Sequence, residues 1–209
     1  RLLRARAARA RVEDHLPPNN YELSGERFLL FTDEGGIWKQ VEKELIKQHK
    51  TVIKVSAAKQ YSKLTDTDYE LNLKNQDDYR QLKNSTGKLH GIIHLSYLWK
   101  SNISSDEYID AQFAFQRAFS DVFSNKGLVL AIVADKSVKV LENDDLDPYK
   151  HTIHTFQKNL IVDYPLLNVL SIDMDQTIDE ERAAGYILSE MKSDSVVKFV
   201  SFRGHKRFI

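Results

Sequence analysis

From residue 26 onward, the apolar residues of this chain fall into two patterns, short continuous runs and longer stripes of helical period. A continuous apolar run of about four to eight residues predicts a buried strand, whereas apolar positions at i, i+4 and i+8 predict a helix with one buried face. The run at 28–32, which is bounded by glycines, predicts the first strand. The stripe Ile37, Val41 and Leu45 then predicts a helix over 37–48.

The same two patterns alternate to the end of the chain. Strands are predicted at 51–57, 69–73, 91–98, 127–134, 169–173 and 196–202, and helices at 75–83, 106–125, 148–162 and 177–191. Asn75 or Asp77 can cap the helix that ends at Lys83, and Pro148 suits the first turn of its helix. A turn at 203–205 leads into Phe208 and Ile209.

Strands that alternate with helices in this way indicate βαβ units, in which the strands pair in parallel. The predicted fold class is therefore α/β, a Rossmann-like parallel sheet flanked by helices. Pro17 and Pro18 break any helix that precedes the alternating region. We divide the chain into an Arg/Ala-rich linker or helix at 1–20 and one Rossmann-like domain at 21–209.

Composition and charge narrow the function classes. The 209 residues contain 30 Lys plus Arg and 30 Asp plus Glu, and a net charge of zero argues against a dedicated nucleic-acid binder. The sequence has no cysteine, so thiolate catalysis, disulfides and Cys-ligated zinc are excluded. It has no apolar run of about 18 residues, so we expect no membrane span.

The first eleven residues contain five arginines among leucines and alanines. We interpret this segment as a linker helix, and an arm for nucleic acid or an acidic surface is the alternative. Because the first residue is Arg1 rather than Met, we expect the sequence to be a piece of a longer protein.

The turn after the first strand is where a Rossmann domain binds the pyrophosphate of a dinucleotide. Here it reads TDEGGIWK (32–39), with two adjacent glycines in place of three spaced ones. Asp33 and Glu34 put carboxylates where phosphates would lie, and Trp38 adds bulk in the first helical turn. Lys54 and Lys59 are the groups available for a 2′-phosphate. We therefore expect no working dinucleotide loop and no cofactor in this chain.

Tyr79 and Lys83 have the Tyr-x-x-x-Lys spacing of short-chain reductases. Such a pair needs a serine about a dozen residues upstream and a competent nucleotide loop. Asp66 lies at the upstream position and the loop is missing. An amphipathic surface helix explains the pair better.

Two histidine pairs are candidate metal ligands. His90 and His94 are four apart on a predicted strand, which separates them by about 13 Å, too far to share a metal. His151 and His154 are three apart on a predicted helix, but no third ligand is evident. A solvated or capping role is the better interpretation of that second pair.

Asp173 and Asp175 flank Met174 at the end of a predicted strand. They are candidate ligands for Mg²⁺, but carboxylates at this position commonly cap the next helix, and we favour the cap. The sequence contains neither a Gly-x-Ser-x-Gly elbow nor a P-loop.

Seven segments carry a family resemblance. They are FLLFTDEGGIWKQVEKELIKQHKTVIKV (28–55), YELNLKNQDDYRQL (69–82), GIIHLSYL (91–98), FQRAF (115–119), LAIVADKSVKV (130–140), DPYKHTIHTFQKNLIVDYPLLNVLSIDMD (147–175) and VSFRGHKRFI (200–209). Their order and spacing resemble the structural subdomain of polyketide synthase ketoreductases, over about residues 21–209. The segment at 69–82 is most similar to the trans-acyltransferase branch.

The resemblance implies a truncated Rossmann fold without an active site, which packs against a catalytic subdomain that follows it in the family. That second half holds the NADPH loop and the catalytic Lys, Ser and Tyr, so no catalytic, cofactor-binding or metal-binding residue is carried over to this chain. The implied parent is a cytoplasmic bacterial multienzyme that reduces a β-ketoacyl chain on an acyl carrier protein with NADPH.

The resemblance also implies the partners of the chain. They are the ketoreductase catalytic subdomain and the neighbouring dehydratase, acyl carrier protein and ketosynthase domains, with a homodimer through the parent module as a further option. No nucleic-acid or membrane partner is expected. The chain would brace the catalytic half or serve as a spacer in its place.

The last predicted strand is too apolar for a freely solvated edge, and two apolar residues follow it at the end of the sequence. The residues concerned are Val196, Phe199, Phe202, Phe208 and Ile209. Because an exposed apolar strand edge tends to pair with other chains, we expect these residues to form an interface with the catalytic subdomain.

Two other function classes stay open. One is a small nucleotide-dependent reductase of Rossmann type with a nonstandard loop, which binding of NADPH would reveal. The other is a stand-alone interaction domain that docks through its basic N-terminal segment, which the gene context would reveal.

Overall fold

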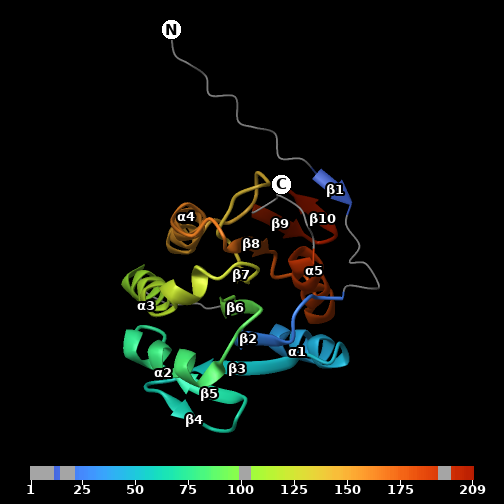
Figure 1. The fold of residues 1–209 in the computed structure, drawn as a ribbon. Helices are drawn as coiled ribbons and strands as arrows, with labels where there is room; N and C mark the ends of the chain where they lie inside the picture. Colours follow the sequence, from blue (N-terminus) through green and yellow to red (C-terminus); the bar gives the residue numbers. More distant parts are fainter. Residues whose placement is uncertain (1–11, 15–21, 99–104, 193–198) are drawn as a thin grey trace.

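The computed structural model describes residues 12–14, 22–98, 105–192 and 199–209. Within these residues the chain forms a ten-stranded sheet with helices on both faces (Figure 1). The strands are β1 (Val12–Asp14), β2 (Arg27–Phe31), β3 (Thr51–Ala57), β4 (Ser62–Lys63), β5 (Asp68–Leu71), β6 (Gly91–Tyr97), β7 (Val129–Ala134), β8 (Asn168–Met174), β9 (Phe199–Arg203) and β10 (Lys206–Phe208). The helices are α1 (Ile37–Lys47), α2 (Gln76–Thr86), α3 (Ser105–Phe123), α4 (Pro148–Asp163) and α5 (Glu180–Lys192).

Seven of the described strands run parallel, in the order β9-β8-β7-β6-β2-β3-β5. The chain begins this sheet in the middle with β2, adds β3 and β5 on one side, and then crosses back to add β6 to β9 on the other. The order therefore reverses between β2 and β6, which is the switch point of a doubly wound fold. Helices α1 and α5 cover one face, and α2, α3 and α4 cover the other (Figure 1).

Short antiparallel strands extend the parallel sheet at both sides. β4 pairs with β5 at one side, and at the other side β10 pairs with β9 and β1 pairs with β10. The turn between β9 and β10 contains Gly204 at φ 59°, a left-handed conformation that glycine adopts without strain. β1 comes from the N-terminal part of the chain, so residues 12–14 lie beside residues 206–208, close to the C-terminus (Figure 1).

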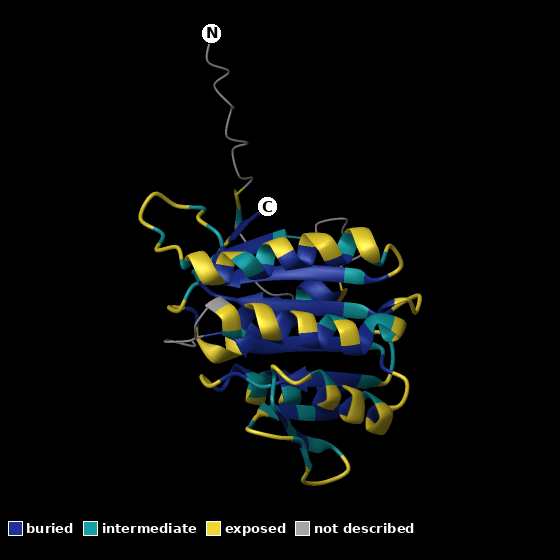
Figure 2. Cartoon of the chain, turned by 90° about the vertical axis from the view of Figure 1, so that its left-hand side faces the viewer, coloured by how far each residue is buried: buried dark blue, intermediate teal, exposed yellow. Residues whose placement is uncertain are grey.

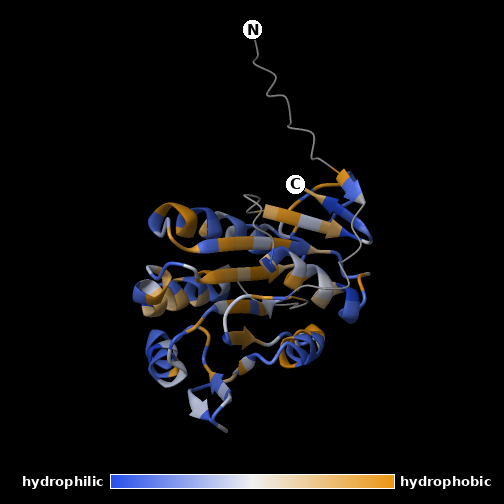
Figure 3. Cartoon of the chain, turned by 45° about the vertical axis from the view of Figure 1, so that its right-hand side comes forward, coloured by the Kyte–Doolittle hydropathy of each residue, from blue (hydrophilic) through white to orange (hydrophobic). Residues whose placement is uncertain are grey.

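The sheet separates two hydrophobic cores. Figure 2 shows the strands as buried between the helices, and Figure 3 shows the hydrophobic residues that the strands contain. Under α2, α3 and α4 the core is aromatic, and Phe115 contacts both Tyr79 and Phe119 at ring-centroid distances of 5.6 and 5.1 Å. Under α1 and α5 the core is mainly aliphatic, with Tyr186 stacked on Phe202 at 4.2 Å. β6 is buried along its whole length and β8 at all but its first residue, and both have core on the two faces of the sheet, as central parallel strands require.

Predicted helix starts agree with the observed caps. The Asn75 side chain accepts the N–H of Asp77 at 2.9 Å and caps α2. Asp147 accepts the N–H groups of Tyr149 and Lys150 at the start of α4, with Pro148 in its first turn. Short polar side chains thus satisfy backbone donors that the first turn leaves without helical partners.

The α/β, Rossmann-like class is confirmed, and the seven predicted strands correspond to β2, β3 and β5 to β9. The predicted start of the last strand at 196 lies outside the described residues. β1 and β4 were not predicted, because two- or three-residue strands leave no periodicity. β10 follows the turn predicted at 203–205. Residues 12–14, in the segment predicted as a linker or helix, form a strand.

The hydroxyl of Tyr79 is buried in the aromatic core and has no hydrogen-bond partner among the described residues. We expect Tyr79→Phe to raise the free energy of unfolding by about 1 kcal/mol, because it removes an unsatisfied polar group. The matched change Tyr186→Phe should lower it by a similar amount, since the Tyr186 hydroxyl donates to the carbonyl of Gly204 at 3.3 Å. Urea unfolding of both variants measures the difference, and a loss of stability in Tyr79→Phe would contradict this account of the core.

Candidate functional site

The carboxyl ends of the parallel strands meet at one edge of the sheet, where α/β proteins of this topology bind their ligands. The loops after β2, β7, β8 and β9 bring charged side chains to this edge. Three groups of contacts occupy it in the described part of the chain: a carboxylate at the start of α1, a buried ion pair behind β7, and a network around the end of β9.

Asp33 occupies the N-terminus of α1. Its two carboxylate oxygens accept the N–H groups of Ile37 at 3.2 Å and Trp38 at 2.8 Å, and the residue is only 6% exposed. These N–H groups lie where a Rossmann domain presents donors to a pyrophosphate. The backbone N–H donors at the start of α1 are therefore satisfied by a carboxylate of the same chain.

The surroundings of this helix start add negative charge. A Cβ atom on Gly36, which has φ 98°, would lie 3.1 Å from a carboxylate oxygen of Glu180. That carboxylate, from the first turn of α5, is thus close to the start of α1. Glu34 is exposed in the same loop. An arriving phosphate would meet like charges here, and at about 4 Å each such contact costs a few kcal/mol in a surface-like dielectric.

The lysines proposed for a 2′-phosphate are differently placed. Lys54 forms ion pairs with Asp68 at 2.8 Å and Glu42 at 3.1 Å. The hydrogen bond that Lys54 donates to Asp68 is the main reason that the pKa of this lysine is raised, against the opposing effect of burial. Lys54 also lies over the ring of Trp38, 5.6 Å from its centroid. Lys59 is exposed beyond the end of β3.

A buried ion pair lies behind the end of β7. Asp135 follows the last residue of the strand and is paired with Lys150 on α4, and both are at most 2% exposed. The other carboxylate oxygen of Asp135 accepts a hydrogen bond from Gln176 at 2.9 Å. This cluster joins β7, α4 and the segment between β8 and α5.

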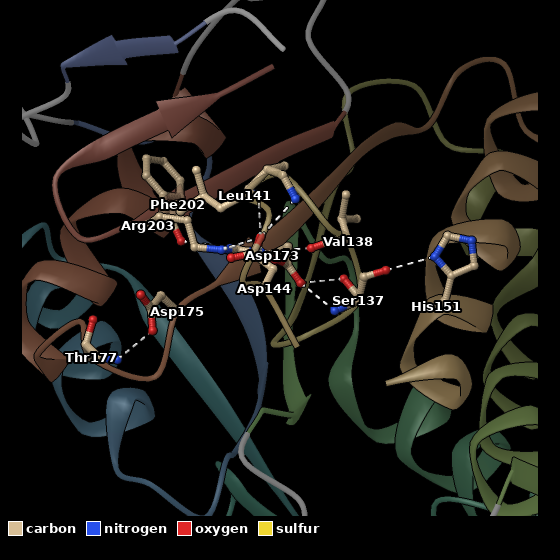
Figure 4. A network of polar contacts seen from close by, with 11 residues as sticks. Ser137, Val138, Leu141, Asp144, His151, Asp173, Asp175, Thr177, Phe202 and Arg203 are labelled. Carbon is tan, nitrogen blue, oxygen red and sulfur yellow. Dashed lines mark hydrogen bonds and ion pairs between the residues drawn. The ribbon is translucent and has the colours of Figure 1, made fainter. Parts of the chain in front are cut away.

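The guanidinium of Arg203, at the end of β9, is the centre of the third group (Figure 4). Its Nη2 atom lies 2.7 Å from Asp173 at the end of β8 and 3.0 Å from Asp144 in the loop after β7, and it donates to the carbonyl of Val138 at 2.8 Å. The second oxygen of Asp173 accepts both the N–H and the hydroxyl of Ser137 at 2.7 Å. The network thus fixes two strand ends and a loop to one another.

Burial and hydrogen bonding move the pKa values of the two carboxylates in opposite directions. Burial raises the pKa of Asp173 and outweighs the opposing effects of Arg203 and Ser137. Burial also acts on Asp144, but hydrogen bonds from Arg203 and from the N–H groups of Val140 and Leu141 hold its pKa below the usual value. Asp144 is therefore the firmly ionised partner of the arginine.

The Tyr79 and Lys83 side chains leave α2 on different faces. Tyr79 is fully buried in the aromatic core, whereas Lys83 pairs with Asp121 of α3 at 2.9 Å. The interpretation as an amphipathic helix is confirmed.

The two histidine pairs form no metal site in the described residues, which contain no cluster of three potential ligands. His90 accepts backbone N–H groups at the amino edge of the sheet, and His94 is stacked between the rings of Phe31 and Tyr97. His151 contacts the carbonyl oxygen of Ser137 through Nδ1, at 2.9 Å.

His154 of α4 packs against Phe199, with ring centroids 4.4 Å apart. Burial, together with the charges of Lys158 and His151, lowers the pKa of His154 to about 4. The ring is therefore neutral near pH 7, and a neutral ring suits packing against an aromatic side chain.

The predicted capping roles of Asp173 and Asp175 need correction. Asp175 does accept the N–H of Thr177 at 3.0 Å, but this stabilises a turn, and α5 begins only at Glu180. In the first turn of α5, the backbone N–H of Arg182 donates to the carboxylate of Asp179 at 2.9 Å, so Asp179 is the residue that caps this helix. Asp173 caps no helix, because its carboxylate is engaged by the network around Arg203 (Figure 4).

The residues proposed as an interface lie in different environments. Val196 is outside the described residues. Phe202 is fully buried against Tyr186, and Phe208, in β10, is 4% exposed. Phe199 and Ile209 are partly buried, the first against His154 and the second against the aliphatic core. Packing within the chain accounts for the apolar character of Phe202 and Phe208, and an interface with a further domain stays a prediction.

Residues 26–193 match the family described as beta-ketoacyl synthase-like, N-terminal, and the chain belongs to that family. No curated protein matches it. None of the helices in the described part of the chain has both the length and the hydropathy of a membrane span.

Solved structures with the same fold include ketoreductase regions of assembly-line enzymes. The adenylation, ketoreductase and pseudo-Asub structure of a keto acid-selecting NRPS module matches 96% of this chain with 18% of its own, at TM-score 0.79 and 17% identity. An N-terminal ketoreductase from the macrolactin assembly line matches 95% of this chain with 42% of its own, at TM-score 0.74 and 13% identity. The first ketoreductase of the tylosin PKS matches 96% of this chain with 40% of its own, at TM-score 0.67 and 14% identity. The chain thus spans less than half the length of these three.

We expect Arg203→Met to lower the free energy of unfolding by about 3 kcal/mol at pH 7, because it leaves the buried Asp173 carboxylate without its counter-charge. The loss should be smaller at pH 5. Because burial raises the pKa of Asp173, the folded state holds a proton on this carboxyl at a higher pH than the unfolded chain does. Protonation therefore stabilises the folded state at low pH, and this contribution is lost as pH rises through the folded pKa.

Urea unfolding at the two pH values measures this loss. The control is Arg182→Met, which breaks the exposed pair with Asp179 at 3.6 Å and should cost less than about 1 kcal/mol. Equal losses in the two variants would show that the buried network adds nothing beyond a surface ion pair.

Proposed function

We propose that this chain is a non-catalytic structural subdomain that braces the catalytic half of a ketoreductase in a polyketide synthase module. The NADPH site and the residues that reduce the β-ketoacyl chain would lie in that other half, and the substrate would arrive on an acyl carrier protein. The chain itself would bind no cofactor and perform no redox step.

One observation carries the non-catalytic part of this proposal: the carboxylate of Asp33 accepts the two N–H groups that a dinucleotide phosphate would need. To bind there, a phosphate would have to displace a capping residue and lie near Glu180. A helix N-terminus attracts anions, and this one already holds one from its own chain.

The bracing role is supported by the other two groups at the carboxyl edge. The Asp135–Lys150 pair and the Arg203 network tie loops to strand ends, where an active enzyme needs loops that can move around its substrate. A fixed edge suits a scaffold. The similarity to ketoreductase regions more than twice the length of this chain favours a partner within the same reductase.

The resemblance of the segment at 69–82 supports an origin in a trans-acyltransferase assembly line of the cytoplasm. Neighbouring dehydratase, carrier and ketosynthase domains are the proposed further contacts. Phe199 and Ile209, the partly buried members of the proposed interface, are the side chains we expect to contact the catalytic half.

Calorimetric titration with NADPH tests the cofactor part of the proposal. We expect no binding tighter than about 50 μM, which corresponds to roughly 6 kcal/mol. A tighter constant in the wild type would favour a nucleotide-dependent reductase with a nonstandard loop over a structural subdomain.

The bracing part is tested in a complete reductase region that carries Arg203→Met, with Arg182→Met as the control. Arg203→Met should shorten the half-life of reductase activity on heating and leave kcat and the KM for NADPH unchanged at 25 °C, because it weakens a scaffold that does not touch the cofactor. A changed KM for NADPH with an unchanged half-life would contradict the proposed role.

A further inference from the structure

The outer side of the sheet is closed by a strand from the opposite end of the sequence. β1 pairs antiparallel with β10, and Val12, Glu13 and Asp14 lie opposite Phe208, Arg207 and Lys206 in turn. Glu13 and Arg207 are 194 positions apart in the chain. This contact was not expected from the sequence, which suggested a linker or helix before residue 21.

The residues that face each other across this pairing are complementary at every position. An apolar residue lies opposite an apolar one, and each of the two acidic residues lies opposite a basic one. A shift by one residue in one direction would place Glu13 opposite Phe208, and a shift in the other direction would place Val12 opposite Arg207, so either shift would break the match. Cross-strand pairs of opposite charge stabilise a register, so β10 selects this alignment of an acidic segment.

Arg207 connects the added strand to the interior. It is 7% exposed and makes two hydrogen bonds with the buried carboxylate of Glu190 on α5, at 2.6 and 3.1 Å. Its remaining terminal nitrogen, Nη1, donates to Glu13 at 3.1 Å. Glu190 holds the guanidinium in place, so Arg207 presents a fixed donor to a carboxylate arriving at the edge.

We propose that the outer edge of β10 is a docking site for an acidic extended segment, and that residues 12–14 of the same chain are its occupant. The site anchors the N-terminal segment to the β9–β10 hairpin, so that a linker entering the domain is held beside that hairpin. This inference stands on the contacts of β1 and β10 and does not depend on the proposed reductase role.

Hydrogen exchange of the backbone amides at 206–208, measured on the complete chain, tests the proposal. Glu13→Lys should raise their exchange rate about fivefold or more, because an edge strand that loses its partner opens locally. Glu13→Gln should have a smaller effect in the same direction. The control Glu22→Lys changes an exposed glutamate outside both strands and should leave these amides unaffected.

A peptide with the sequence of residues 10–16 should restore protection to the Glu13→Lys chain, and the same peptide with lysine at the Glu13 position should not. Unchanged exchange in Glu13→Lys would overturn the proposal. Protection of 206–208 that rises with protein concentration in the wild type would also overturn it, because the occupant would then be the acidic segment of a second copy.

Discussion

The carboxyl edge of this sheet is governed by the need to neutralise charge that the fold buries. Arg203 and Lys150 carry guanidinium and ammonium groups into places with little water, where an unpaired charge would cost several kcal/mol. Each is matched by a carboxylate at the carboxyl end of a strand, Asp173 within the last two residues of β8 and Asp135 directly after β7. The positions of the loops around these strands follow from that pairing.

The same constraint satisfies, from within the chain, polar groups that a ligand could otherwise engage at this edge. An enzyme of this topology leaves donors at its strand ends for a cofactor or substrate, and the protein groups there are completed by the ligand. Here Asp33 completes the α1 N-terminus, and Asp173 and Asp144 complete Arg203. A domain whose polar groups are satisfied internally is suited to hold a neighbour in position, which is the role proposed for it.

Local patterns predicted the parts of this structure that depend on near neighbours in the sequence. The stripe of α1, the cap Asn75 and the place of Pro148 in the first turn of α4 are of this kind. So is the carboxylate of Asp33 at the start of α1, since Asp33 binds N–H groups only four and five positions ahead. Arg203 pairs with a residue 59 positions away, and nothing in its own segment distinguishes it from a turn residue. Carboxylates at the carboxyl ends of buried strands were the available signal for Asp135 and Asp173.

The apolar C-terminal strands show that composition alone does not separate an interface from packing within the chain. Their composition suggested a surface that needs another domain, yet the sheet and α5 already bury Phe202, and β1 covers the outer edge of β10. Segments separated by almost the whole chain produce this burial, and no single-sequence periodicity contains that information. An interface at this end depends on the partly buried side chains, Phe199 and Ile209.

The central claim is that the N–H groups at the start of α1 are held by Asp33 and are unavailable to a phosphate. Amide chemical shifts of Ile37 and Trp38, followed by nuclear magnetic resonance during titration with pyrophosphate, test it most directly. The account predicts no saturable shift in the wild type at millimolar pyrophosphate and a saturable shift in Asp33→Ala, where the donors are released. A saturable shift in the wild type would contradict it.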